Sequence, residues 1–340
     1  MRDSDAEPSA PPVDTPGGEL AVLPLRGGEH VGRYVILYRL GKGGMGVVYA
    51  AYDPQLDRKL AIKLMRPRSG GRARAGQTAM LHEAQALARL SHPNVVAIHD
   101  VGLLGERVFV AMDFVDGVTL RRWVAQPRRP REIVAAYVQA GEGLAAAHRA
   151  GIVHRDFKPD NALVGKDPQG SAHAVGRVQV LDFGLARVHE HATVGQARNA
   201  DDRAPAVLRG TPMYMAPEQH RGEDAGPACD QFAFCVALYE ALWKRLPFAG
   251  QDNLAIGRAI VEGRRIEPPR GEVPARIRRA ILRGLDTDPR ARFPTMEALV
   301  AELRVTGGRR ARIVAIAAGS AAIGVAAWAY GRSSGRGDDP

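Results

Sequence analysis

The stretch His-Arg-Asp-Phe-Lys-Pro-Asp-Asn at residues 154–161 decides the fold of this chain, in combination with Asp-Phe-Gly at residues 182–184. A tripeptide such as the second motif arises often by chance, but an eight-residue string at a suitable distance before it does not. Together the two motifs supply carboxylate, amide and lysine side chains. Such a set is typical of phosphoryl-transfer sites, which need oxygen ligands for a divalent metal and a separate carboxylate facing the nucleophile.

We therefore predict one role for each of four residues in these motifs. Asp156 takes the proton of an attacking hydroxyl, and Lys158 neutralises charge on the transferred phosphoryl group. Asn161 and Asp182 bind Mg²⁺ through their side-chain oxygens. The alternative is that all four are ordinary polar loop residues, which would leave the spacing of the two motifs without a reason.

A glycine-rich segment lies upstream, after the β-branched run at 34–37. It fits the pattern G-x-G-x-x-G-x-V, in which glycines let backbone N–H groups approach phosphates. The predicted nucleotide-binding residues here are Leu40, Gly41, Lys42, Gly43, Gly44, Met45, Gly46, Val47 and Val48. The pattern also resembles a dinucleotide-binding fingerprint, but that fingerprint leads into a helix, whereas residues 47–52 continue as a strand. We therefore predict a β-hairpin.

A lysine follows within an apolar strand, in the sequence Leu-Ala-Ile-Lys at 60–63. A buried lysine needs an anionic partner, and both nucleotide phosphates and a glutamate on a helix are suitable. We predict that the glutamate is Glu83, because the alanine- and leucine-rich segment 78–90 favours a helix. The alternative for Glu83 is a solvent-exposed position on that helix.

These motifs and their order resemble those of the bacterial serine/threonine protein kinases of the eukaryotic-like (Hanks) type, over residues 34–304. The resemblance implies an α+β, two-lobed protein kinase fold. A small lobe with a five-stranded antiparallel sheet and one helix is joined by a hinge to a mainly helical large lobe, and ATP with Mg²⁺ lies between them. The implied catalytic residues are Lys63, Glu83, Asp156, Lys158, Asn161 and Asp182.

The resemblance also implies a pocket for the adenine ring. Its implied apolar walls are Val48, Ala61, Leu163 and the gatekeeper Met112. The backbone of Asp113 and Val115 would hydrogen-bond to the adenine edge. For the apolar residues, plain core packing is an alternative that is compatible with this role.

Further matches lie in the large lobe. Glu218, in Ala-Pro-Glu at 216–218, and Arg292 resemble the family's buried ion pair, and Asp230 resembles the residue that anchors the catalytic loop. Lys158, together with Thr211 before Ala-Pro-Glu, implies serine and threonine side chains of proteins as substrates.

The composition sets broad limits on the function. The net charge of +10 could indicate nucleic-acid binding, but the arginines are scattered along the chain without interleaved aromatic residues, so we expect no nucleic-acid partner. The two cysteines, Cys229 and Cys235, lack metal-site spacing and cannot form a disulfide framework.

The two ends of the chain differ from the kinase segment. Residues 1–30 are rich in proline and acidic residues, and we expect a disordered leader. After a basic segment at 305–312, the uncharged residues 313–330 are expected to form a single transmembrane helix in the inner membrane, with 331–340 outside and the kinase in the cytoplasm. The alternative is a buried or peripheral helix. Small residues in this segment would also permit a homodimer.

The activation segment departs from the family pattern. Its sole hydroxyl between Asp182 and Gly210 is Thr193, whereas relatives carry phosphorylatable hydroxyls near the Gly-Thr. Arg155 is the family's usual partner of an activation-loop phosphate. The acidic pair at 201–202 could replace that phosphate as a fixed negative charge, but the sequence favours the alternative, a solvated loop charge.

Three functions remain open from the sequence. The first is an active protein kinase that uses ATP and Mg²⁺ on protein serine and threonine hydroxyls and signals at the inner membrane. The second is a pseudokinase scaffold without turnover, and the third is a basic nucleic-acid-binding protein. The presence of all the implied catalytic residues favours the first.

Overall fold

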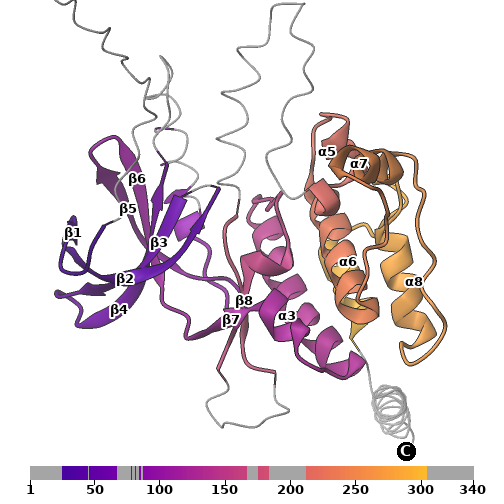
Figure 1. Cartoon of the computed structure of the whole chain (residues 1–340), viewed down its shortest axis with the longest axis horizontal. Coiled ribbons are helices and arrows are strands. Elements are labelled where there is room, and N and C mark those ends of the chain that lie inside the picture. Colours follow the sequence, from indigo (N-terminus) through magenta and orange to yellow (C-terminus); the bar gives the residue numbers. More distant parts are fainter. Residues whose placement is uncertain are drawn as a thin grey trace, which may run out of the picture.

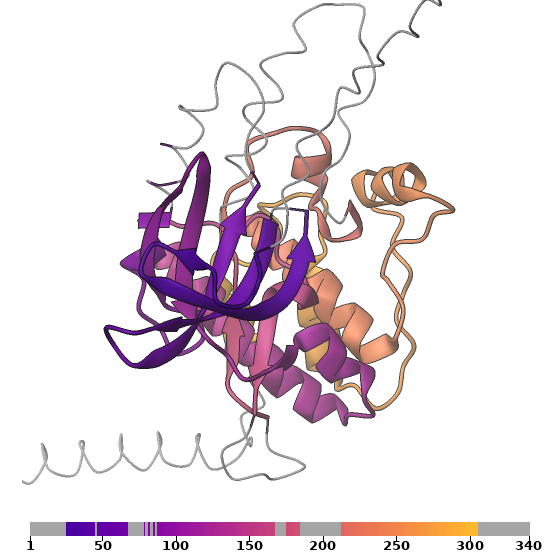
Figure 2. The ribbon, with the colours of Figure 1, turned by 60° about the vertical axis from the view of Figure 1, so that its left-hand side comes forward.

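The small lobe is built on an antiparallel sheet in the order β1-β2-β3-β4-β6-β5 (Figure 1). The computed structural model describes residues 25–44, 46–66, 78, 81, 84–85, 87–166, 175–183 and 212–304. The strands are β1 (His30–Val31), β2 (Tyr34–Gly43), β3 (Gly46–Asp53), β4 (Arg58–Met65), β5 (Ile98–Leu104) and β6 (Arg107–Asp113). Seen after a 60° turn, this sheet curls as one layer beside the helices of the large lobe (Figure 2).

The glycine-rich segment forms the predicted hairpin between β2 and β3. These strands pair from Val35 opposite Tyr52 to Gly43 opposite Gly46, and β3 then pairs with β4. The segment therefore leads into a strand and not into a helix, which excludes the dinucleotide-binding alternative.

Two expectations for the small lobe need correction. The sheet has six strands in place of five, because His30 and Val31 pair with Val35 and Tyr34 across a tight turn. Gly32 permits this turn with its φ of +58°. The expected leader of residues 1–30 also extends too far, since the N–H of Gly28 donates to the carbonyl of Ile36 at 2.9 Å. Residues 1–24 lie outside the described part of the chain.

The segment between β4 and β5 contains the predicted helix. Its described residues 78, 81, 84–85 and 87–88 are helical, and Ala84 and Leu87 are buried against the core. The predicted residues Glu83 and Met45 lie outside the described residues.

The large lobe is mainly helical and also contains the small antiparallel sheet β7-β8-β9. Its first elements are β7 (Gly117–Thr119), α2 (Leu120–Ala125), α3 (Pro130–Arg149), the 3-10 turn η1 (Pro159–Asn161), β8 (Ala162–Gly165) and β9 (Val178–Val180). They are followed by η2 (Pro212–Tyr214), α5 (Pro217–His220), α6 (Pro227–Trp243), α7 (Asn253–Val261), α8 (Ala275–Gly284) and α9 (Met296–Leu303). In Figure 1, β7 and β8 lie between the small-lobe sheet and the helices α6 and α8.

Helix α6 is the centre of the large lobe. It is apolar on almost every side, as expected for a helix surrounded by protein, and its residues 232–239 are all buried. The ring of Phe234 on α6 packs edge-on against Tyr137 of α3, with 5.6 Å between ring centroids. Cys229 and Cys235 are both on this helix as buried free thiols. The helix thus provides a rigid base for the loops that it contacts.

Several sequence expectations fall on residues that the structure does not describe. They concern Thr193, Asp201, Asp202 and Thr211 of the activation segment, and the C-terminal segments 305–312, 313–330 and 331–340. Within the described residues, no helix combines the length and apolar character that crossing a bilayer requires.

Candidate functional site

The loop at 154–161 is held by a buried carboxylate of helix α6. Asp230 accepts hydrogen bonds from the backbone N–H groups of His154 at 2.8 Å and Arg155 at 2.7 Å, and the ring of His148 lies 2.8 Å from the same carboxylate. Burial opposes the charge on Asp230, but the hydrogen bond with His148 and the nearby histidines offset it, so the pKa of Asp230 is lowered. Arg155 adopts a φ of +63°, which these bonds stabilise.

Asp156 is surrounded by the other polar residues of the loop. Lys158 Nζ lies 2.7 Å from Asp156 Oδ2. The side-chain amide of Asn161 donates to the backbone carbonyl of Asp156 at 2.8 Å and to its Oδ2 at 3.3 Å. The loop therefore fixes a carboxylate next to a cation, and the Asn161 amide is turned so that its oxygen is left for another ligand.

Asp182 follows strand β9, which pairs with β8 beside the same loop. The N–H of Leu181 donates to the carbonyl of Asn161 at 2.8 Å, so the two predicted metal ligands belong to adjacent backbone segments. Asp182 also forms an ion pair of 2.7 Å with Lys63, which is buried on β4 as predicted. Asp182 has a φ of +77°, a strained conformation of the kind that gathers at functional sites.

The aromatic rings of Phe183 and His154 pack together next to Asp182. The Phe183 ring is buried against the His154 ring at a centroid distance of 4.8 Å, and His154 Nε2 lies 2.7 Å from the carbonyl of Leu181. Both residues lie within the quoted motifs, but local sequence patterns assign neither of them a role. Their aromatic character within charged motifs was the available signal.

Three glycines of the glycine-rich hairpin have open surroundings. Among the described residues, no atom lies within 4 Å of a Cβ built at Gly41, Gly43 or Gly44. The packing of the chain therefore does not require glycine there, whereas a ligand that binds to the backbone would. At Gly46 a Cβ would come within 2.2 Å of the Leu64 carbonyl, so this glycine is needed for the pairing of β3 with β4.

The residues implied around the adenine ring come from both lobes. Ala61 on β4 pairs with Met112 on β6, Val48 lies on β3 opposite Lys63, and Leu163 lies on β8. The N–H of Asp113 donates to the carbonyl of Ala97 at 3.0 Å, so this N–H is not available to an adenine edge. Val115 packs against the main core.

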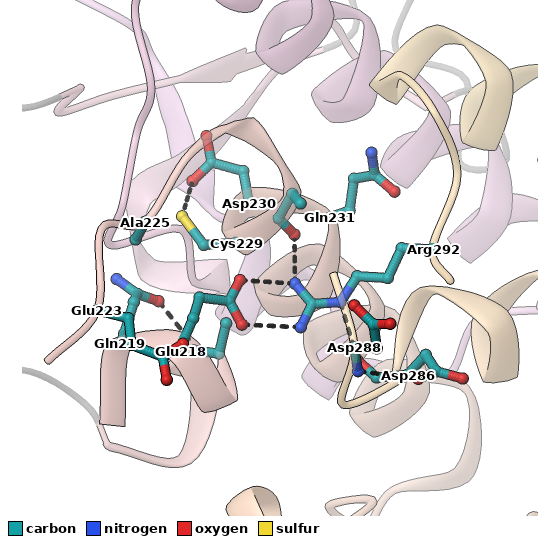
Figure 3. A network of polar contacts seen from close by, with 12 residues as sticks. Glu218, Gln219, Glu223, Ala225, Cys229, Asp230, Gln231, Asp286, Asp288 and Arg292 are labelled. Atoms are coloured by element: carbon teal, nitrogen blue, oxygen red, sulfur yellow. Dashed lines mark hydrogen bonds and ion pairs between the residues drawn. The ribbon is translucent and has the colours of Figure 1, made fainter. Parts of the chain in front are cut away.

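The predicted ion pair of the large lobe is present and buried (Figure 3). The two terminal nitrogens of the Arg292 guanidinium donate to the Glu218 carboxylate, at 2.7 and 2.8 Å. The carbonyls of Asp286 and Ala228 accept the remaining Arg292 hydrogen bonds, each at 2.9 Å. Gln219, which sequence reasoning missed, donates to the carbonyl of Arg155 at 2.8 Å and thereby links this region to the catalytic loop.

The residues of the site fit ATP and Mg²⁺. Mg²⁺ prefers a few protein oxygen ligands together with phosphate oxygens and water, and Asn161 and Asp182 provide oxygens of this kind. Lys63 supplies a positive charge next to the Asp182 carboxylate. The open surroundings of the glycines allow phosphates to approach the backbone.

The amino-acid sequence is similar to those of known protein kinases. The family model "Protein kinase domain" matches residues 34–302. The serine/threonine-protein kinase PknL of Mycobacterium tuberculosis is 37% identical over 226 residues, which cover 66% of this chain and 52% of PknL. The serine/threonine-protein kinase PrkC of Bacillus subtilis is 32% identical over 277 residues, which cover 80% of this chain and 40% of PrkC. The chain thus spans about half the length of PknL, and less of PrkC.

A solved structure shows the same fold. The PknI kinase domain of Mycobacterium tuberculosis superposes with a TM-score of 0.60 at 22% identity, over 82% of this chain and 98% of that domain. The family model covers well over half of the sequence, and it begins at the first long strand of the sheet and ends within the last helix. The chain therefore belongs to the protein kinase family.

Proposed function

We propose that the protein is an active serine/threonine protein kinase that transfers the γ-phosphoryl group of ATP to protein hydroxyls with the help of Mg²⁺. The observation that carries this proposal is the convergence of two motifs. The 2.7 Å ion pair of Lys63 with Asp182 adjoins a loop in which Lys158 and Asn161 both contact Asp156. A scaffold that only binds partners has no need of this set of charges.

Each side chain has a defined task in this proposal. The carboxylate of Asp156 orients the substrate hydroxyl and accepts its proton, and the Lys158 ammonium stabilises negative charge on the transferred group. Lys63 binds the phosphates, and Asn161 and Asp182 would hold the metal. Mg²⁺, when bound, neutralises charge on the phosphate oxygens. Catalysis is then mainly positioning and electrostatic stabilisation in a fixed site.

The choice of serine and threonine as acceptors rests on two supports. Lys158 lies next to the carboxylate that faces the acceptor, as the resemblance to serine/threonine kinases implies. The similar proteins PknL and PrkC are also serine/threonine-protein kinases by name.

Turnover on a generic basic protein substrate tests the proposal. The wild-type chain should transfer labelled phosphate from ATP in a Mg²⁺-dependent manner, and Asp156→Asn should lower kcat by about 10² to 10⁴, because it removes the proton acceptor but keeps the shape. Nucleotide binding without transfer in the wild type would instead identify a pseudokinase scaffold. Salt-sensitive binding of nucleic acid without ATP turnover would identify the third function.

Ion pairs in the described part of the large lobe argue against the nucleic-acid-binding alternative. Three arginines of the large lobe are paired with glutamates, at 2.6 Å for Arg149 with Glu297 and for Arg304 with Glu142, and at 2.9 Å for Arg276 with Glu302. Paired charges of this kind weaken the positive field that would attract phosphates.

We also propose that residues 313–330 anchor the kinase in the inner membrane as a single span. The support is the sequence alone: an uncharged stretch of suitable length after a basic segment. Deleting residues 309–340 should move the protein from the membrane fraction to the soluble fraction without loss of activity, because all the implied catalytic residues precede the deletion. Recovery of the full chain in the soluble fraction would contradict the anchor.

A further inference from the structure

Arg121, on helix α2, is the centre of a polar network beside the catalytic loop. Its Nε lies 2.7 Å from Asp160, its Nη1 3.3 Å from Glu240 and its Nη2 2.7 Å from the hydroxyl of Tyr214. The Tyr214 hydroxyl in turn donates to Glu240. One guanidinium thus joins α2, η1, η2 and α6, and it is bound by two carboxylates at once.

The network borders a pocket. A cavity of about 220 Å³ is lined by the charged residues Arg121, Glu240 and Lys244, with an apolar floor that includes Val124, Ala237 and Ala241. The Lys244 ammonium donates to the carbonyl of Val124 at 2.7 Å. Pro159 of the catalytic loop forms part of the same wall. The side chains of Asp160 and Glu240 remain 45% and 28% exposed, so a group that enters from solvent can reach them.

The Asp160 end of this network adjoins the loop that holds Asp156. Asp160 directly precedes Asn161, whose amide contacts the Asp156 carboxylate at 3.3 Å. An extended peptide advances about 3.3–3.6 Å per residue, so side chains within a few positions of an acceptor at Asp156 can reach this region. The carboxylates of Asp160 and Glu240 already bind one guanidinium, that of Arg121, so their arrangement suits guanidinium recognition.

We propose that Arg121 determines substrate specificity by acting as a built-in counter-ion, which denies the carboxylates of Asp160 and Glu240 to basic side chains of the substrate. A substrate arginine gains little in the native protein, because Arg121 already makes the hydrogen bonds that it would need. Specificity of this kind depends on the difference in binding free energy between correct and incorrect partners. The protein then does not select acceptor sites that are flanked by basic residues.

The proposal rests on the proposed kinase activity, and the experiment separates the two. Two peptide sets that differ by one residue, arginine or leucine, at each position within three residues of a single serine should be assayed for kcat/KM. In the wild type, kcat/KM for the arginine peptide divided by kcat/KM for the matching leucine peptide should be near one at each position. In Arg121→Met this ratio should rise about tenfold at one position at least, because two freed carboxylates can bind the peptide guanidinium.

Three further variants control the experiment. Arg121→Lys retains the charge and should keep a ratio near one, and Arg122→Met, at the neighbouring exposed arginine, should leave the ratio unchanged. Adding Glu240→Gln to Arg121→Met should remove most of the gain. The gain should also shrink at high salt, since the carboxylates are partly exposed.

The outcomes are distinct. If the wild type phosphorylates neither the peptides nor a generic protein, the proposed function fails. If the wild type and Arg121→Met are both active with equal ratios, or if the wild type already prefers arginine strongly, the role of Arg121 is refuted. Should Arg121→Met not melt cooperatively, Arg121→Gln replaces it, and it has to show the same gain in the ratio.

Discussion

The Lys63→Met variant should lose phosphoryl transfer by at least about a thousandfold while it keeps its fold. Methionine fits the buried, apolar surroundings of Lys63 on β4 and removes a charge that is costly to bury. Its former partner Asp182 is partly exposed, with a side-chain exposure of 21%, and water can solvate it. The effect therefore falls on the chemistry and not on stability. Single-turnover assays and thermal melting of the same preparations would check it.

A matched lysine provides the control for this variant. Lys166, on the surface, pairs with Asp116 through a side chain that is 75% exposed, and Lys166→Met should retain near wild-type turnover. Asp182→Ala should be as inactive as Lys63→Met. Turnover close to that of the wild type in either variant would show that the assigned site is wrong.

The Arg292→Met variant should have the largest effect on stability. It leaves Glu218 buried without its partner, and breaking a buried pair in this way costs about 3–5 kcal/mol. For a protein of this size the melting temperature should fall by about 10 °C. Denaturant unfolding and thermal melting measure both quantities.

An exposed pair is the matched comparison for the buried one. Arg276 and Glu302 are 44% and 48% exposed, so Arg276→Met should cost about 1 kcal/mol or less. Replacing Glu218 and Arg292 together by apolar residues should cost less than the sum of the two single changes, because no unpaired charge remains. Equal costs for Arg292→Met and Arg276→Met would mean that the buried pair contributes no more than a surface one.

The sequence predicted the parts of the structure that its local patterns determine. The β-branched run before the glycines predicted the hairpin, and the apolar neighbours of Lys63 predicted a buried strand, because burial and pairing there follow from adjacent residues. The short strand at His30 has no such pattern. This strand depends on a turn at Gly32. The proline-rich composition of the preceding residues led to the prediction of disorder up to residue 30.

Contacts between distant segments were beyond local patterns. Arg121 lies 119 positions from Glu240 and 93 from Tyr214, and no periodicity connects them. The pair of Glu218 and Arg292 is almost as distant, yet the resemblance to a family predicted it. The pair of Glu218 and Arg292 belongs to known motifs. The Arg121 network, in contrast, forms only when the fold brings η1, η2 and α6 within reach of one side chain on α2.

The bonds from Asp230 to the catalytic loop have a consequence for motion. Local opening of a loop is easy when few buried contacts hold it, but the amides of His154 and Arg155 are tied to a carboxylate inside the most buried helix. Freeing them requires disruption of the core around α6. We therefore expect the loop that holds Asp156 to unfold in the same cooperative unit as the interior of the large lobe, so that its carboxylate does not fluctuate independently.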